Sequence, residues 1–145
     1  MGTTNSLNVI TVAIVEDRPL VVMGLERLLE RDGFRICWKA PTLDDVRVGM
    51  EAELPDVVVI GSRRVLAFRE EVTCISSQTE MLVLVDDADE AMHDHLILAG
   101  ARGIVELADD EQLVLRAISR VRAGELWIDS AACGAGVISH EMACH

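Results

Sequence analysis

Five short apolar runs alternate along this chain with segments of helical periodicity, and this alternation limits the folds that the chain can adopt. The runs are residues 9–15, 34–40, 57–60, 81–85 and 104–107. Each is too short for a helix, and the first is β-branched and apolar on both faces, as central parallel strands are. Five strand–helix units in series predict an α/β fold, a doubly wound parallel sheet with helices on both faces.

Helix signals follow each predicted strand. Asp17 is placed to cap the first helix, and Pro19 lies close to its first position, where a missing N–H costs nothing. Thr42 and Asp45 have the spacing of a capping box at the start of the second helix. A third helix, regular or irregular, is expected over residues 65–75, a fourth up to about Ala99, and a last one from residue 109 to Gly124.

Length and charge set further limits. At 145 residues the chain suits one domain that needs no disulfide or metal to fold. Its net charge of −12 argues against a nucleic-acid surface, because phosphate contacts require clustered Lys and Arg. No apolar run approaches the ~20 residues of a membrane span, and residues 1–6 lack the features of a signal peptide, so we expect a cytoplasmic protein with no membrane contact. We interpret residues 1–8 as an N-terminal extension and 129–145 as a linker or disordered tail.

The four cysteines are scattered without CxxC spacing. Cys37 and Cys74 lie within predicted regular elements, and we expect buried free thiols there. The tail carries atoms that bind zinc, on residues Cys133, His140, Cys144 and His145. Their spacing matches no familiar set of zinc ligands, so a disordered tail is the preferred interpretation.

Four segments together closely resemble response-regulator receiver domains, in particular those of two-component regulators that carry a LuxR-type helix-turn-helix. These segments are residues 15–29, 55–60, 99–103 and 122–128. The resemblance covers residues 9–128. It implies a flavodoxin-like, five-stranded parallel sheet of order 2-1-3-4-5 with five helices. In ordinary members it also implies a Mg²⁺-dependent transfer of phosphoryl from a histidine kinase to an aspartate after the third strand.

The positions that carry this chemistry in the family hold unsuitable residues here. The acceptor position is Gly61, the family's Ser or Thr after strand four aligns with Val85, and its Lys after strand five falls at Leu107, or at Glu106 if the register slips by one. Glycine cannot attack phosphorus, valine has no hydroxyl and leucine cannot neutralise phosphoryl charge. The only lysine in the chain is Lys39, in strand two, so no nearby lysine can take over. The resemblance therefore implies a degenerate receiver, or pseudo-receiver, without phosphoryl transfer and without a cofactor.

An acidic pocket is what remains of the family site. Ligands of such sheets bind beyond the carboxyl ends of the strands, where Glu16, Asp17 and Asp86 fall. For Glu16 and Asp17 one interpretation is a weak Mg²⁺ site, and the preferred one is that Asp17 caps the first helix while Glu16 is solvated. Asp86 is followed by further acidic residues at 87, 89 and 90. The preferred interpretation of these four residues is a charged first turn of the fourth helix, and the alternative is that they extend a metal site. His93 and His95, two residues apart on one helix, point in different directions and are poor joint ligands.

Arg63 and Arg64 stand just beyond Gly61. A planar guanidinium matches a carboxylate in bidentate fashion, so one of the two could enter the vacated cleft and pair with an acidic residue of the pocket. The alternative is a solvated pair of loop residues. If the pairing forms, a fixed internal cation would replace metal and phosphoryl charge and hold the switch in one state.

The leading hypothesis is an atypical receiver of a transcriptional regulator that acts through protein contacts. In relatives, homodimers form through helices one and five, or through helix four, strand five and helix five; a solvated helix face is the alternative. DNA binding would need a C-terminal domain beyond residue ~130, and we prefer an excised fragment over a stand-alone receiver. A second hypothesis is a small-molecule sensor that uses the emptied acidic cleft. An enzyme is not expected, because the chain lacks a Gly-rich phosphate loop and a recognisable nucleophile–base pair.

Overall fold

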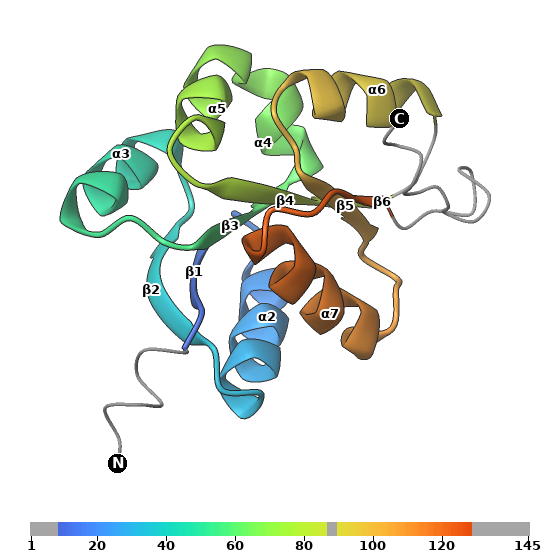
Figure 1. The fold of residues 1–145 in the computed structure, drawn as a ribbon. Helices are drawn as coiled ribbons and strands as arrows, with labels where there is room; N and C mark the ends of the chain where they lie inside the picture. Colours follow the sequence, from blue (N-terminus) through green and yellow to red (C-terminus); the bar gives the residue numbers. More distant parts are fainter. Residues whose placement is uncertain (1–8, 87–89, 129–145) are drawn as a thin grey trace.

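A computed structural model describes residues 9–86 and 90–128 and places six parallel strands in one sheet (Figure 1). The strands are β1 Thr11–Val15, β2 Arg35–Ala40, β3 Val57–Gly61, β4 Glu80–Val85, β5 Gly103–Glu106 and β6 Trp127–Ile128. Their order is β2-β1-β3-β4-β5-β6, and every neighbouring pair is parallel. The predicted doubly wound sheet with order 2-1-3-4-5 is confirmed for the first five strands.

The sixth strand was not predicted. Trp127 donates its backbone N–H to the carbonyl of Arg102, 2.9 Å away, and pairs in register with Gly103 beside β5. This strand was missed because it is only two residues long, too short for a periodic pattern of apolar residues to be detected.

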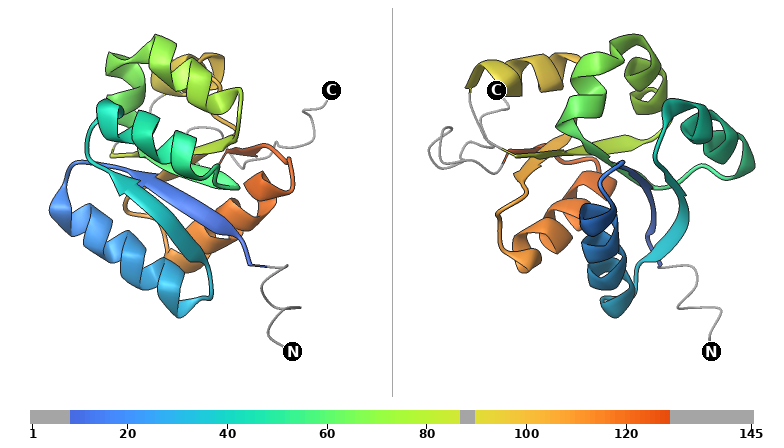
Figure 2. Two further views of the ribbon diagram at one scale, coloured as in Figure 1. Left: turned by 90° about the vertical axis from the view of Figure 1, so that its left-hand side faces the viewer. Right: turned by 180° about the vertical axis from the view of Figure 1, so that it is seen from behind.

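Helices cover both faces of the sheet, as the two further views show (Figure 2). The helices α2 Pro19–Arg31 and α7 Glu111–Arg122 lie on one face. The opposite face carries α3 Leu43–Ala52, α4 Ser62–Ala67, α5 Arg69–Ser76 and α6 Glu90–Leu98. The expected count of five helices was wrong, because the third predicted helix is divided into α4 and α5.

Phe68 separates these two helices. Its φ of −134° and ψ of 62° lie outside the helical range. Its N–H donates to the carbonyl of Arg64 in α4, and its carbonyl accepts the N–H of Val72 in α5. The ring is partly exposed, whereas Val65 and Val72 are fully buried. The helical spacing of these apolar residues was therefore real, but it belongs to two consecutive helices.

The core consists of two layers of side chains, one on each face of the sheet. Along β3, Val57 and Val59 point toward α2 and α7, and Val58 and Ile60 point toward the four helices opposite. All four are fully buried. This burial on both faces explains why the central strands are continuous apolar runs.

The predicted cap of the second helix is confirmed, whereas the predicted burial of the cysteines is not. Thr42 caps α3 as predicted, its hydroxyl accepting the Asp45 N–H at 3.2 Å. Cys74 is exposed, so the expectation of a buried thiol was wrong there; the residues of α5 that enter the core are Val72 and Ile75. Cys37 is half-buried, and burial raises the pKa of its thiol.

The N-terminal extension, the tail with its candidate zinc ligands, and two of the acidic residues after β4 lie outside the described residues. These are residues 1–8, 129–145 and 87–89. Within the described ranges, no helix has the length and apolar character needed to cross a membrane.

Candidate functional site

Three of the predicted site residues meet at the carboxyl edge of the sheet, where β1, β3 and β4 end. Gly61 is the last residue of β3, Glu16 follows β1 and Asp86 follows β4. The backbone of Gly61 has φ −71° and ψ 143°, an ordinary extended conformation that any residue can adopt. A Cβ at residue 61 would lie 2.6 Å from Oε1 of Glu16, so a side chain there would require the Glu16 carboxylate to move.

Glu16 is buried, with only 4% of its surface exposed, and Arg18 holds its carboxylate. Arg18 Nε donates to Oε2 at 2.8 Å, and Arg18 Nη2 donates to Oε1 at 3.2 Å. The backbone N–H of Arg18 also donates to Oε2 at 2.9 Å. The preferred expectation of a solvated Glu16 was therefore wrong, because an arginine two residues away supplies the hydrogen bonds that a buried carboxylate needs.

Arg18 also reaches the loop after β4. Its Nη1 donates to both carboxylate oxygens of Asp86, at 3.0 and 3.1 Å. Hydrogen bonding to Glu16 is the main cause that raises the pKa of Arg18 above its ordinary value, so the guanidinium keeps its charge. One side chain thus bridges two carboxylates that follow different strands.

Sequence reasoning missed Arg18. The expected cations of the cleft were the arginines after Gly61, whereas the bridging arginine is part of the turn that carries the acidic pair. The available signal was a cation two residues beyond an acidic residue at the end of a buried strand.

Asp17 does not cap the first helix. The N-cap position of α2 is Arg18, and no side chain bonds there. Asp17 instead pairs with Arg64, whose Nη2 donates to its carboxylate. That hydrogen bond is the largest cause that lowers the pKa of Asp17 below its ordinary value. The predicted cap was wrong because the helix begins one residue later, at Pro19.

Arg63 is more loosely held. Its Nη2 lies 4.0 Å from Oδ2 of Asp86, and 69% of its side chain is exposed. The cluster thus gathers three carboxylates and three guanidiniums at one edge of the sheet, on residues Glu16, Asp17, Asp86, Arg18, Arg63 and Arg64. Formal charges of −3 and +3 balance to zero.

The positions after β4 and β5 lie next to each other. Val85 is fully buried and pairs in register with Glu106, and its carbonyl accepts the N–H of Leu107 at 2.7 Å. Leu107 is the first residue after β5 and is exposed. The N–H of Glu106 donates to Oδ2 of Asp109 at 2.8 Å. Neither Val85 nor Leu107 offers a side-chain hydrogen-bonding group.

The residues present do not fit the Mg²⁺ that the family resemblance implies. Glu16 and Asp86 are engaged by Arg18, and the third position, Gly61, has no carboxylate. In the part of the chain that the structure describes, no three His, Cys, Asp or Glu side chains gather closely enough to hold a metal ion. His93 is buried and His95 is exposed on the same helix, so the two face different surroundings.

Comparison with known proteins supports the fold. No family model matches the chain. The chain is 26% identical over 122 residues to a probable transcriptional regulatory protein, SgaR, of Hyphomicrobium methylovorum. That match covers 81% of this chain and 58% of the relative, so the chain spans less than two thirds of the relative's length.

Solved structures of response regulators are similar. A LuxR-family two-component response regulator from Aurantimonas sp. SI85-9A1 is 22% identical with a TM-score of 0.78, covering 87% of this chain and 94% of that one. The signal receiver domain of the putative response regulator NarL from Mycobacterium tuberculosis is 18% identical with a TM-score of 0.72, covering 81% and 98%. At these identities the likeness establishes the fold, which is that of response-regulator receiver domains.

Proposed function

We propose that this chain, which has the receiver fold, is the regulatory domain of a two-component-type transcriptional regulator and that it signals without aspartate phosphorylation. Its role is regulatory rather than enzymatic. It acts through contacts with other protein surfaces, and its acidic pocket is held by an arginine in place of a metal ion.

The observation that carries this proposal is the relationship between Gly61, Glu16 and Arg18. A side chain at residue 61 would meet the Glu16 carboxylate, which Arg18 fixes by three hydrogen bonds. The acceptor position therefore lacks the nucleophile, and a side chain placed there would have to displace the Glu16 carboxylate from its bonds to Arg18. Because the charges of the cluster balance, a divalent cation would have to displace a guanidinium from carboxylates that it already binds.

Ion pairs across this pocket link elements that are far apart in the sequence. In the proposed mechanism, Arg18 ties the start of α2 to Asp86 at the end of β4 permanently, and Arg64 ties α4 to Asp17 in the same way. The domain is then held in one state, and its output is set by which protein surface it contacts. The whole regulator would bind DNA through a separate C-terminal domain, as LuxR-type regulators do.

Homodimerisation is part of the proposal. The surfaces that the resemblance implies correspond to α2 with α7, or to α6 with β5 and α7. The exposed face of α7 carries Arg116, Arg120 and Arg122 on a chain of net charge −12, which gives opposite charges to complementary edges. A small-molecule sensor is the weaker candidate, because Glu16 and Arg18 occupy the space next to Gly61 that an emptied cleft would offer.

The proposal is tested by treating the purified chain with acetyl phosphate and Mg²⁺ and measuring its intact mass. No phosphoryl adduct is expected. A receiver domain with an acceptor aspartate, treated in parallel, must gain one phosphoryl group for the result to count. In a second measurement, beryllofluoride with Mg²⁺ should leave the amide NMR spectrum of the chain unchanged. A covalent adduct on the chain would contradict the proposal.

A further inference from the structure

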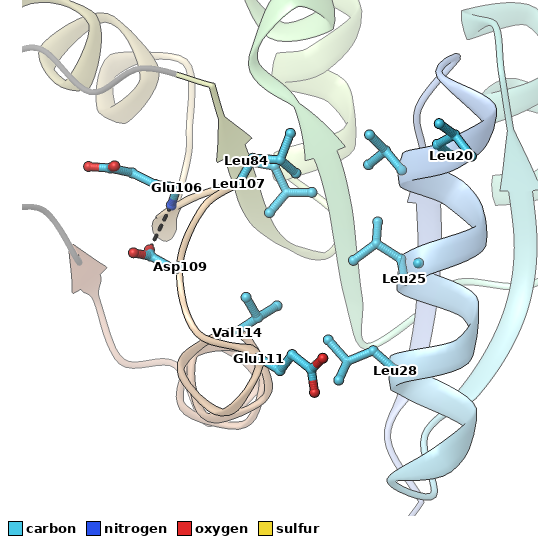
Figure 3. A pocket seen from close by; sticks show the side chains of 11 residues that line it. Leu20, Leu25, Leu28, Leu84, Glu106, Leu107, Asp109, Glu111 and Val114 are labelled. Carbon is cyan, nitrogen blue, oxygen red and sulfur yellow. Dashed lines mark hydrogen bonds between the residues drawn. The ribbon is translucent and has the colours of Figure 1, made fainter.

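Two grooves open on opposite faces of the sheet. An apolar groove of about 370 Å³ lies between α2 and α7, and Figure 3 shows Leu25, Leu28 and Val114 facing it. It belongs to a surface that the resemblance already implies for dimers. The other groove, of about 450 Å³, lies between α3 and α5 on the opposite face (Figure 1). We call it the α3–α5 groove. A dimer through either of the implied surfaces would leave it open.

The floor of the α3–α5 groove is apolar and comes from both helices. Val46 and Ile75 are buried members of the core layer on this face, and Leu43 and Met50 pack against that layer. A methionine side chain is flexible, so Met50 can adapt to apolar partners of different shape. The groove therefore offers a preformed apolar surface with one adaptable side chain.

The charged groups left at the rim of the α3–α5 groove are carboxylates. Arg47 lines the groove but pairs with Asp44 at 3.3 Å. Glu51 and Glu71 are exposed, and neither has an ion-pair partner among the residues that the structure describes. Helices α3 and α5 together carry five carboxylates and two guanidiniums, a net charge of −3. The rim therefore favours a cationic partner.

The two unpaired carboxylates stand on different walls and toward different ends of the groove. Glu71 is in the first turn of α5, and Glu51 is next to the last residue of α3. Both helices run back from the carboxyl edge of the sheet to its amino edge, because each connects two parallel strands. A small ligand with a single positive charge cannot pair with both carboxylates.

A basic amphipathic helix meets these conditions. The ten residues of α3 extend over about 15 Å, which is long enough for apolar side chains at i, i+3, i+4 and i+7 of a partner helix to lie along the floor. Lysine or arginine residues beside that apolar stripe can reach both walls. Their aliphatic stems cross apolar surface while their charges stay at the rim.

We propose that the α3–α5 groove binds an amphipathic helix of a partner protein, with its apolar stripe on the floor and with lysine or arginine residues paired to Glu51 and Glu71. This inference rests on the proposed contact-based function and names the kind of partner. A receiver that is held in one state then passes on its output through a surface that its own dimer leaves free.

The test measures binding of a synthetic peptide to the full chain by fluorescence anisotropy. The probe contains only leucine and lysine, with the leucines along one helical face, and has about 14 residues, the length at which an isolated helix becomes marginally stable. We expect a dissociation constant below about 100 µM at low ionic strength, and weaker binding as salt screens the charges. A peptide of the same composition but scrambled order has no apolar stripe and should bind at least about tenfold more weakly.

Matched variants locate the binding site. Glu51→Gln and Glu71→Gln should each weaken binding about two- to fivefold, the scale of an exposed ion pair. Glu70→Gln is their control, because Glu70 is exposed on α5 but does not line the groove. Cys74→Arg places bulk and positive charge at the rim and should weaken binding further. Val48→Arg puts the same charge on α3 outside the groove and should have little effect. All five side chains are exposed, so the fold should persist, and circular dichroism verifies it.

The thiol of Cys74 reports occupancy directly, because it is exposed and lines the groove. With the peptide at about ten times its dissociation constant, iodoacetamide should alkylate Cys74 about tenfold more slowly, since few sites remain empty. Cys37 is half-buried on β2, outside the groove, and its rate should not change. Mass spectrometry of proteolytic peptides resolves the two sites.

Three outcomes would overturn the inference. The first is that the amphipathic peptide does not bind, or binds no better than its scrambled form, so that charge alone attracts it. The second is equal weakening by Cys74→Arg and Val48→Arg, which would place the peptide on another surface. The third is binding of octylamine with the affinity of the peptide, which would make a small amphiphilic cation the occupant. None of them bears on the phosphoryl test, because the absence of an adduct on Gly61 does not depend on this groove.

Discussion

The carboxylate of Glu16 lies where a side chain at residue 61 would have to be. Its Oε1 is 2.6 Å from the position of a Cβ on Gly61, and this oxygen is itself bound by Arg18 Nη2 at 3.2 Å. A carbon atom cannot come that close to an oxygen without one of them moving. The absence of a side chain at residue 61 and the arrangement of Glu16 with Arg18 are therefore parts of one packing arrangement.

Gly61→Ala should lower the free energy of unfolding by about 1 kcal/mol. The backbone there is extended, so alanine alone would stabilise by roughly 0.4–1 kcal/mol through the unfolded state. Displacing Glu16 would weaken charged hydrogen bonds worth about 1.5–3 kcal/mol each, and this loss is larger. Urea denaturation measures the difference.

Gly61→Asp should be less stable than Gly61→Ala, because it adds a negative charge beside Glu16. It should also remain unphosphorylated by acetyl phosphate, since Arg18 still engages the carboxylates of the pocket. An alanine variant as stable as the parent would mean that Glu16 moves aside without cost.

Arg18→Met should lower the free energy of unfolding by about 2 kcal/mol at neutral pH. Removing one partner of a buried ion pair costs about 3–5 kcal/mol. The expected loss is smaller here because Arg18 is partly exposed and because its backbone N–H still donates to Glu16. Chemical denaturation gives the value.

Arg47→Met is the matched control for Arg18→Met. Arg47 pairs with Asp44 at 3.3 Å on the solvated face of α3, and such pairs contribute about 0–1 kcal/mol. Equal losses in the two variants would show that the Arg18 bridge has no special role in stability.

Arg64→Gln should lower the free energy of unfolding at neutral pH and leave it unchanged in strong acid. Arg64 lowers the pKa of Asp17 in the folded state, so the interaction stabilises the fold above the unfolded pKa of about 3.9. Its contribution is lost as the pH falls through the lowered folded pKa. The gap between parent and variant should thus be present at pH 7, at no more than about 1 kcal/mol for a partly exposed pair, and absent in strong acid.

The carboxyl NMR signal of Asp17 provides the direct measurement for this prediction. Its titration midpoint should move upward in Arg64→Gln. Arg63→Gln should leave it in place, because Arg63 lies near Asp86 and is mostly exposed. A midpoint that does not respond to Arg64 would contradict the pairing.

Two glycine substitutions in helices should have opposite effects. A Cβ on Gly49 of α3 would lie 2.6 Å from Cε2 of Trp38, whose indole N–H donates to the carbonyl of Glu53. Gly49→Ala should therefore destabilise by about 1–3 kcal/mol through overpacking and alter the tryptophan fluorescence. Gly24→Ala on α2 meets nothing and should stabilise by about 0.5–1 kcal/mol, as helix propensity predicts. If both substitutions raised the free energy of unfolding, the ring of Trp38 would have to repack at little cost.

The sheet could be predicted from the sequence because burial on two faces leaves a local pattern. Residues 57–60 are apolar without interruption, and β3 is fully buried along that stretch. The break at Phe68 could not be predicted in the same way. Apolar residues recur at helical spacing on both sides of Phe68, so the sequence pattern looks like one helix. The division into α4 and α5 becomes visible only in the tertiary structure.

The sequence predicted the acidic residues of the candidate site and, as one of two interpretations, a pairing of Arg63 or Arg64 with one of them, which Arg64 and Asp17 form; it missed Arg18 and both of its partners. Arg64 with Asp17, and Arg18 with both Glu16 and Asp86, are specific partners chosen among several acids and arginines near one edge. Sequence distance gives no guide, because Arg18 and Asp86 are 68 residues apart.

By itself, the sequence determined the alternation of the first five strands with helices, the burial of the central sheet and the absence of a nucleophile at residue 61. These follow from periodicity and side-chain chemistry, which act locally. Only the tertiary structure decided that Glu16 is buried, that Arg18 holds it and bridges to Asp86, and that α2 and α7 enclose an apolar groove. Such contacts join the ends of different strands and helices, so they exist only once the sheet has brought those ends together.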